Sequence, residues 1–155
     1  MVEVGKSPPA FTLKDQDERP VRIRALAGQW VVLYFYPKDD TPGCTIQACD
    51  FSEGVAGFEA LDAVVLGCSP DDADSHRRFI AKHGLTISLL SDPDHTVMAS
   101  YGAYGDKVLY GKRTVGVIRS TVLIDPDGKV AHHWKRARAK GHADLVRRRL
   151  EELRG

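Results

Sequence analysis

The chain has 155 residues, a net charge of +1 and a hydrophobic fraction of 43%, values typical of one soluble globular domain. A nearly neutral charge argues against electrostatic binding to nucleic acid or to a membrane surface. The amino-terminal stretch lacks the apolar run of a signal peptide, and no segment reaches membrane-spanning length. Three cysteines in a chain without an export signal favour redox use in a reducing compartment, so we expect a cytoplasmic protein.

Hydrophobic patterning and turn-forming residues divide the chain into strands that alternate with helices. In the first half we expect a hairpin over 11–23, one helical turn over 25–28, a strand over 31–36, a helix from Cys44 to about Leu61 and a strand over 63–68. A helix capped by Ser69 should follow and end at Gly84, and then a strand over 85–90 and a short helix over 94–101. The last third should contain a surface loop over 102–112, strands over 115–124 and 130–134, and a final helix from about His142. This order predicts an α/β fold with a mixed central sheet and helices on both faces, in one domain spanning residues 1–155.

Local signals support several of these elements. Ser69 is expected to cap the helix that follows it, because Pro70 then occupies the first helical position and acidic residues fill the first turn. The run from Asp125 to Gly128 is a strong hairpin turn between the last two strands. In the final helix, apolar residues recur on one face, which we expect to be buried. These residues are Leu145, Val146, Leu150 and Leu153.

The most informative stretch is VVLYFYPKDDTPGCTIQAC, which runs from Val31 to Cys49. Its six leading apolar or aromatic residues predict a strand covered on both faces, and Pro37 ends that strand because proline cannot donate to a sheet ladder. Cys44 then falls in the first turn of a helix, just beyond the carboxyl end of a buried strand, where α/β folds place reactive groups. A thiol reacts as the thiolate, which the unpaired N–H groups and partial positive charge of a helix start stabilise.

Other residues near Cys44 fit a reactive thiol. Thr41 carries a hydroxyl that could orient a bound oxygen, and the prolines on either side of it fix the local backbone. Cys49 lies five residues downstream of Cys44, which suggests attack by one thiol followed by disulfide closure with the other. The alternative is that Cys44 is a buried and inert cysteine. Cys68, at the end of a strand, is expected to be a buried and inert cysteine, unless it serves as an alternative resolving thiol.

The spacing Pro37-x-x-x-Thr41-x-x-Cys44 resembles the active-site signature of peroxiredoxins. The fuller string YPKDDTPGCTIQAC is similar to the peroxiredoxin Q branch, also called bacterioferritin comigratory protein. Similar strings follow in order along nearly the whole chain: FTLKDQDE, SPDDADSHRRF, LLSDPDH and GVIRSTVLIDPDGKV. The resemblance implies a thioredoxin-like fold with an N-terminal β-hairpin and the activity of a thiol peroxidase. It also implies that Arg119, which pattern alone could leave as an exposed charge, lies beside the reactive thiolate.

The mechanism that this resemblance implies needs no organic cofactor and no metal. Cys44 attacks one oxygen of hydrogen peroxide or an organic hydroperoxide and becomes a sulfenic acid. Thr41, Arg119 and helix-start N–H groups orient the peroxide, and Pro37 shields the site from water. Cys49 then condenses with the sulfenic acid, and thioredoxin or a similar dithiol protein reduces the disulfide. The resemblance also favours a monomer.

Helix geometry adds an expectation about the two cysteines. Five residues of α-helix advance about 7.5 Å and leave two side chains roughly 140° apart, whereas a disulfide normally needs Cα atoms within about 7 Å. If both cysteines lie on one helix, the segment from Cys44 to Gly54 must partly unfold whenever they bond. Gly54 and Gly57 weaken the helix where that opening is needed.

Two other functions stay open on the sequence alone. A thioredoxin-like disulfide carrier is disfavoured because such proteins use Cys-x-x-Cys, which the chain lacks. A non-catalytic scaffold with incidental cysteines would differ from a peroxidase in consuming no peroxide. The histidines predict no metal site, since the neighbours His132 and His133 point to opposite faces of a strand. The basic run over 135–140 lacks interleaved aromatic residues, which favours a solvated loop over a nucleic-acid site.

Overall fold

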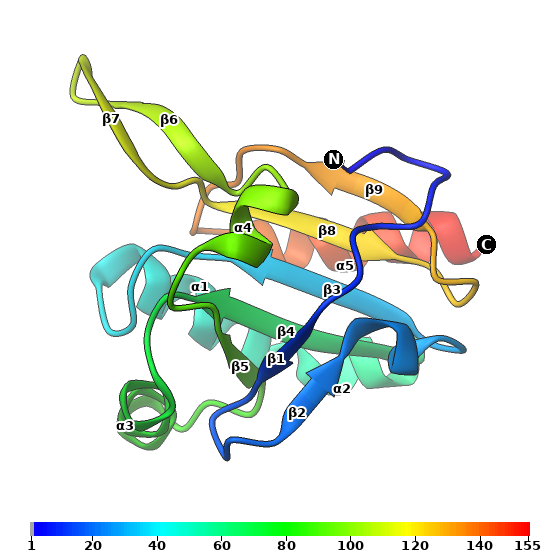
Figure 1. The fold of residues 1–155 in the computed structure, drawn as a ribbon. Helices are drawn as coiled ribbons and strands as arrows, with labels where there is room; N and C mark the ends of the chain where they lie inside the picture. Colours follow the sequence, from blue (N-terminus) through cyan, green and yellow to red (C-terminus); the bar gives the residue numbers. More distant parts are fainter. Residues whose placement is uncertain (1) are drawn as a thin grey trace.

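The structure is a computed structural model that describes residues 2–155; for Leu109 it describes only the backbone. Its centre is a seven-stranded mixed sheet in the order β2-β1-β5-β4-β3-β8-β9, and a two-stranded sheet of β6 and β7 projects from it (Figure 1). The strands are β1 (Thr12–Lys14), β2 (Pro20–Arg22), β3 (Trp30–Phe35), β4 (Ala63–Ser69), β5 (Ser88–Ser91), β6 (Tyr104–Leu109), β7 (Lys112–Val117), β8 (Ser120–Ile124) and β9 (Val130–Trp134). The helices are η1 (Ile23–Leu26), α1 (Pro42–Glu53), α2 (Val55–Ala60), α3 (Ala73–His83), α4 (Thr96–Ser100) and α5 (His142–Arg154).

The central strand is β3, which is buried along its whole length. It pairs in parallel with β4 and antiparallel with β8, so both of its edges are hydrogen-bonded. Alternate residues of β3 supply two hydrophobic cores. One core contains Trp30, Val32 and Tyr34 with side chains of α1, α2, α3 and α5, and the other contains residues 31, 33 and 35 with side chains of η1 and α4.

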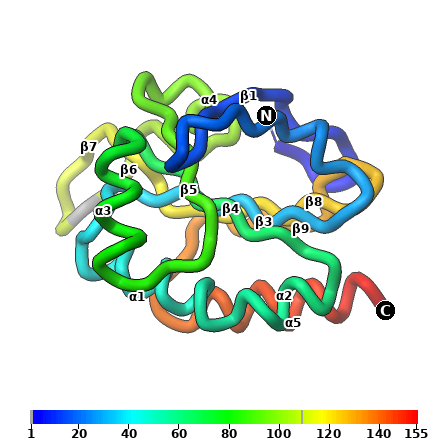
Figure 2. Tube along the Cα trace, turned by 90° about the horizontal axis from the view of Figure 1, so that it is seen from below, coloured from blue at the N-terminus to red at the C-terminus, as the bar shows by residue number. Residues whose placement is uncertain are grey.

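Helices cover both faces of the sheet, as the sequence predicted. In Figure 2 the sheet lies between a layer of α1, α2 and α5 on one side and α4 with the amino-terminal segment on the other. The predicted amino-terminal hairpin is also present, because β1 and β2 pair from Thr12 with Arg22 to Lys14 with Pro20. Lys14 also pairs with Ser91 of β5, which adds the hairpin to the edge of the main sheet.

The prediction of a surface loop over 102–112 is wrong. Most of that segment belongs to an antiparallel hairpin formed by β6 and β7, which extends away from the main sheet (Figure 1). The two residues at its tip, Tyr110 and Gly111, have φ angles of 53° and 78°. Positive φ at both central residues is the geometry of a two-residue turn whose twist matches the flanking strands. The predicted strand over 115–124 is likewise two strands, β7 and β8, separated at Ile118 and Arg119.

Two predicted helices also differ from the structure. The helix expected to run from Cys44 to Leu61 is interrupted at Gly54, which separates α1 from α2. The helix expected to be capped by Ser69 is capped instead by Asp72, whose carboxylate accepts a hydrogen bond from the Ser75 N–H at 2.8 Å. Ser69 is the last residue of β4, so the chain needs three more residues to turn before α3 can begin.

The buried face of α5 is narrower than predicted. Val146 and Leu150 are fully buried, whereas Leu145 and Leu153 are 45% and 38% exposed. Each residue turns the helix by about 100°, so Leu145 lies well away from the line joining Val146 to Leu150. Among residues 2–155, no helix is both long enough and apolar enough to cross a membrane.

Candidate active site

Cys44 is the third residue of α1, and only 1% of the residue is exposed. The segment over 37–41, here called the active-site loop, connects the end of β3 to α1. Thr41 precedes the helix in an extended conformation, and its carbonyl oxygen accepts a hydrogen bond from the Thr45 N–H at 2.8 Å. Pro42 occupies the first helical position, where its missing N–H has no helical partner to lose. The predicted position of Cys44, at a helix start beyond a buried strand, is confirmed.

Arg119 reaches Cys44 from 75 positions later in the chain. Its Nη2 donates a hydrogen bond to the Cys44 sulfur at 3.2 Å, and its Nη1 donates to Oε1 of Gln47 at 2.5 Å. The sheet explains this approach, because Phe35 at the end of β3 pairs with Ser120 at the start of β8. Arg119 precedes Ser120 directly and therefore lies at the same edge of the sheet as α1.

Gly43 allows the guanidinium to lie close to the helix. A Cβ atom at this position would lie 3.2 Å from Nη2 of Arg119 and 3.6 Å from the Cβ of Ala139. The first distance is tighter than most Cβ contacts, so a larger residue would require the guanidinium to move by a few tenths of an ångström. Glycine before Cys44 allows the guanidinium its present position.

Gln47 belongs to the site, although the sequence analysis did not select it. It is fully buried on α1 and lies three residues after Cys44, a spacing that puts the two side chains on the same helix face. Its Oε1 holds Arg119, while its Nε2 has no hydrogen-bond partner in the part of the chain that the structure describes. The buried hydroxyl of Tyr34 also lacks a partner within residues 2–155. Burial raises the pKa of Tyr34, and the charge of Cys44 adds to the shift.

Thr41 and Pro37 lie on the active-site loop, and both are half-buried. The hydroxyl of Thr41 donates to the backbone carbonyl oxygen of Lys38 at 2.9 Å. This hydrogen bond closes the loop on itself and orients the lone pairs of the hydroxyl oxygen. A hydroxyl that already donates in this way remains free to accept a hydrogen bond.

Cys49 lies on the same helix as Cys44, in the last two turns of α1, and is half-buried. Burial raises the pKa of Cys49, and the nearby carboxylates of Glu53 and Asp50 raise it further. All three thiols of the chain are free. Because the helix is continuous from Pro42 to Glu53, Cys44 and Cys49 are held apart in this state.

Cys68 lies on β4 and is fully buried, as predicted. Its side chain belongs to the core on the opposite face of the sheet from the core that contains Cys44. Burial raises the pKa of Cys68 well above its usual range, and Asp92 adds to the shift. The sheet therefore separates Cys68 from Cys44.

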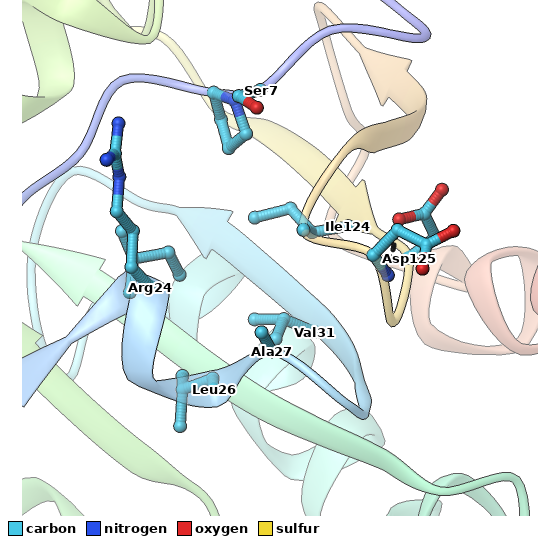
Figure 3. Close-up of a pocket in the computed structure, with 11 residues that line it drawn as sticks. Ser7, Arg24, Leu26, Ala27, Val31, Ile124 and Asp125 are labelled. Atoms are coloured by element: carbon cyan, nitrogen blue, oxygen red, sulfur yellow. Dashed lines mark hydrogen bonds between the residues drawn. The ribbon is translucent and has the colours of Figure 1, made fainter.

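A hollow of about 270 Å³ lies at the other end of β3, where Val31 pairs with Ile124 (Figure 3). Its apolar lining includes Leu26, Val31 and Ile124, with Arg24 and Asp125 at opposite sides. None of the residues that line it is a cysteine, so it is separate from the thiol site. Across residues 2–155, no three side chains of the metal-binding types come together to hold an ion.

The comparison with known families agrees with this geometry. Residues 4–133, which include Cys44, Cys49 and Arg119, match the AhpC/TSA family. The chain belongs to the AhpC/TSA family. Within this family it is similar to proteins named peroxiredoxin Bcp. A putative peroxiredoxin Bcp of Helicobacter pylori is 46% identical over 152 residues, which cover 98% of each chain. The peroxiredoxin Bcp of Bacillus subtilis is 38% identical over the same length, covering 98% of this chain and 97% of the relative.

A solved structure of the bacterioferritin comigratory protein of Xanthomonas campestris superimposes with a TM-score of 0.91. It is 36% identical, covers 99% of this chain and 100% of its own, and was studied for its alkyl peroxide reduction activity. This AhpC/TSA protein thus has the thioredoxin-like fold that its motifs predicted. Peroxiredoxins are peroxidases, so the predicted enzyme class is confirmed as well.

Proposed function

We propose that the chain is a two-cysteine thiol peroxidase in which Cys44 attacks the peroxide. The observation that carries the proposal is the hydrogen bond of 3.2 Å from Arg119 to the Cys44 sulfur. A guanidinium at this distance stabilises a thiolate, and the unpaired N–H groups at the start of α1 add to that effect. The buried oxygen of Gln47 holds the guanidinium in this orientation.

Attack of the thiolate on one peroxide oxygen breaks the O–O bond. The sulfur keeps the attacked oxygen as a sulfenic acid, and the other oxygen takes a proton and leaves as water or an alcohol. Arg119 and the helix start stabilise the negative charge that develops on the leaving oxygen. The hydroxyl of Thr41 accepts a hydrogen bond from the peroxide, and Pro37 covers the loop side of the site.

Cys49 is proposed as the resolving thiol. Its sulfur attacks the sulfenic acid of Cys44, the hydroxyl group leaves as water, and a disulfide forms within the chain. Since both cysteines lie on α1, the helix must unwind before their sulfurs can meet. A dithiol protein such as thioredoxin then exchanges its thiols with this disulfide and returns both cysteines to the reduced state.

The remaining proposals concern the setting of the enzyme. Hydrogen peroxide and organic hydroperoxides are both proposed as substrates, and the Xanthomonas relative supports the organic class because its study concerns alkyl peroxide reduction. We further propose that residues 1–155 act as one domain and as a monomer in the cytoplasm. No nucleic acid or membrane partner is proposed, in line with a net charge of +1.

Stopped-flow measurement of thiol loss with hydrogen peroxide and with an organic hydroperoxide tests the proposal. Cys44→Ser should abolish peroxide consumption, because no other thiol has its position beside Arg119. Cys49→Ser should consume one equivalent of peroxide and then stall or over-oxidise. Undiminished consumption by Cys44→Ser contradicts the assignment of Cys44, and normal turnover of Cys49→Ser with thioredoxin contradicts that of Cys49.

The same experiment separates the peroxidase from a disulfide carrier. A carrier would exchange disulfides with partner proteins and would consume no peroxide in the absence of a partner. The helix speaks against a carrier, because it separates the two thiols in the reduced state. A carrier requires a disulfide that opens and closes without rearranging its helix.

A further inference from the structure

His76 is fully buried on α3, and both of its ring nitrogens face oxygen atoms. Nε2 lies 2.9 Å from the backbone carbonyl oxygen of Leu90, and Nδ1 lies 2.6 Å from Oδ2 of Asp39. A carbonyl oxygen can only accept, so Nε2 carries a proton. The short contact at Nδ1 then requires a second proton, shared between the ring and the carboxyl group of Asp39.

The other side chains around Asp39 also donate to it. The hydroxyl of Tyr36 donates to Oδ1 at 2.5 Å, and the hydroxyl of Ser75 donates to Oδ2 at 2.8 Å. Burial raises the pKa of Tyr36, with Tyr34 and Asp39 adding to the shift, so its hydroxyl keeps its proton and remains a donor. While the shared proton is present, Asp39 and His76 together carry no net charge in their buried site.

Asp39 belongs to the active-site loop, so these contacts attach the loop to α3. Its backbone N–H also donates to the carboxylate of Asp71 at 2.8 Å, just before α3 begins. On the exposed side of the loop, the carboxylate of Asp40 contacts Lys82 at 2.7 Å and His83 at 2.8 Å. Both contacts lower the pKa of Asp40. The titratable groups around the buried pair are thus Tyr34, Tyr36 and Asp71, with the Asp40 cluster outside them.

We propose that Asp39 and His76 form a proton-dependent clamp that holds the active-site loop in position for the peroxide step. The proposal deepens and rests on the proposed function of Cys44. Without the shared proton, the lone pair of Nδ1 would face a buried carboxylate at 2.6 Å, which is repulsive and leaves an uncompensated charge. Loss of the shared proton, which a rise in pH favours, therefore opens the clamp.

Opening of the clamp affects the reaction by changing the position of Cys44 relative to Arg119. The active-site loop leads directly into the first turn of α1, so its movement displaces Thr41 and Cys44. Arg119 comes from the other side, beside β8, and is held there by Gln47. A small displacement between the sulfur and the guanidinium slows attack, because reacting groups must be aligned within a fraction of an ångström.

Nitrogen-15 NMR of the histidine rings observes the shared proton directly. In the wild-type protein we expect one proton on Nε2 and a second proton in the Nδ1 contact, shared with Asp39. In Asp39→Asn the amide can donate to Nδ1, so we expect the ring proton on Nε2 alone. A wild-type Nδ1 whose contact with Asp39 contains no proton overturns the clamp.

The rate of the peroxide step tests the consequence of the clamp for the reaction. It is measured by loss of the Cys44 thiol in a Cys49→Ser background. With Asp39 present we expect the rate to fall by about tenfold toward alkaline pH, the size expected for a lost buried hydrogen bond and a displaced reacting group. Asp39→Asn should remove this fall, whereas Asp39→Ala should slow the step at every pH. Asp40→Asn is the matched control, because it breaks the exposed contacts of the same loop and should keep the alkaline fall.

Failure of the clamp and failure of the proposed function give different results. An equal alkaline fall in Asp39→Asn and its parent, with normal attack by Cys44, overturns the clamp alone. Absence of peroxide attack in the Cys49→Ser protein overturns the proposed function. The protonation state of the His76 ring then still decides whether the clamp exists.

Discussion

The two ends of α1 differ in the polar groups around them. At the first turn, Cys44 accepts a hydrogen bond from Arg119, and the preceding loop is attached to α3 by buried contacts. At the last turn, Asp50 and Glu53 occupy the carboxyl end of the helix, where the helix dipole favours cations instead. A hollow of about 410 Å³ lies beside this end and is also lined by residues of α2 and α5. Its lining residues are Asp50, Glu53, Gly54, Phe58, Gly141, Ala143, Asp144 and Arg147.

This difference matches the two halves of the proposed cycle. Attack on a peroxide needs a fixed sulfur and fixed donors, which the first turn provides. Disulfide closure needs the helix to unwind around Cys49, and the acidic residues of the last turn, which oppose the helix dipole, favour that unwinding. One helix thus combines a first turn suited to the first reaction with an acidic last turn suited to the second.

Removing the guanidinium of Arg119 beside the first turn of α1 should have the largest effect on the rate of the peroxide step. Arg119→Met keeps most of the side-chain volume but removes the donors to the Cys44 sulfur and to Gln47. We expect the peroxide step to slow by about 10²–10³-fold, the usual cost of removing one charge-stabilising donor. Arg119→Lys should cost less, because it keeps the charge and loses only the planar fork. An unchanged rate and pH profile in Arg119→Met would remove this residue from the site.

Amide hydrogen exchange compares the protection of α1 in the reduced and disulfide forms. In the disulfide form, residues 44–54 should exchange at least about tenfold faster than in the reduced form, because their helical hydrogen bonds must break. The amides of β3 should stay protected in both states, since this strand is buried and paired on both edges. Equal protection of α1 in the two redox states would mean that Cys49 is not the partner of Cys44.

A substitution that stabilises the helical conformation at the carboxyl end of α1 should slow disulfide closure. Gly54 has helical dihedral angles, and an added Cβ would lie 3.4 Å from the carbonyl oxygen of Asp50, so alanine can be accommodated. Gly54→Ala should stabilise the fold by about 0.5–1 kcal/mol and slow closure after peroxide attack. Gly57, which the sequence predicted to weaken the same helix, lies in α2 beyond the opening segment, so Gly57→Ala is the matched control. An added Cβ there meets only the Arg147 side chain within 4 Å. Equal closure rates in the two variants would place the opening elsewhere.

The smallest expected effect comes from the charges around Cys49. Its pKa is raised, first by burial and then by Glu53 and Asp50, so closure should speed up as the pH rises and more thiolate forms. Glu53→Gln should lower this pKa and shift the pH profile of closure to lower pH, with a rate gain of about twofold. Glu59→Gln, on α2, should leave the profile unchanged. Identical profiles for both variants would show that Glu53 does not act on Cys49.

The sequence predicted the central features of the fold because their signals are local. The run from Trp30 to Phe35 is apolar throughout, and Pro37 and Pro42 mark the end of a strand and the start of a helix. The hairpin of β6 and β7 was missed because its turn, Tyr110 and Gly111, is not one of the common turn pairs and glycines surround it. The cap at Asp72 was missed because Ser69 offered an equally good local signal.

The site was predictable only in part, for a related reason. Cys44 and Thr41 lie within one short motif, and Arg119 was found through its family resemblance. The contact of Asp39 with His76 spans 37 positions between a loop and a helix, and no local pattern indicates it. Gln47 could have been found, since a buried amide three residues after a reactive cysteine shares its helix face.

The antiparallel pairing of β3 with β8 also has a consequence for biosynthesis. Cys44 leaves the ribosome early, whereas the arginine that donates to its sulfur follows 75 residues later. A nascent chain can fold its amino-terminal hairpin first, but it cannot bring the guanidinium to the sulfur until β8 has been made and paired with β3. The contact between the guanidinium and the sulfur therefore forms only when most of the chain has been translated.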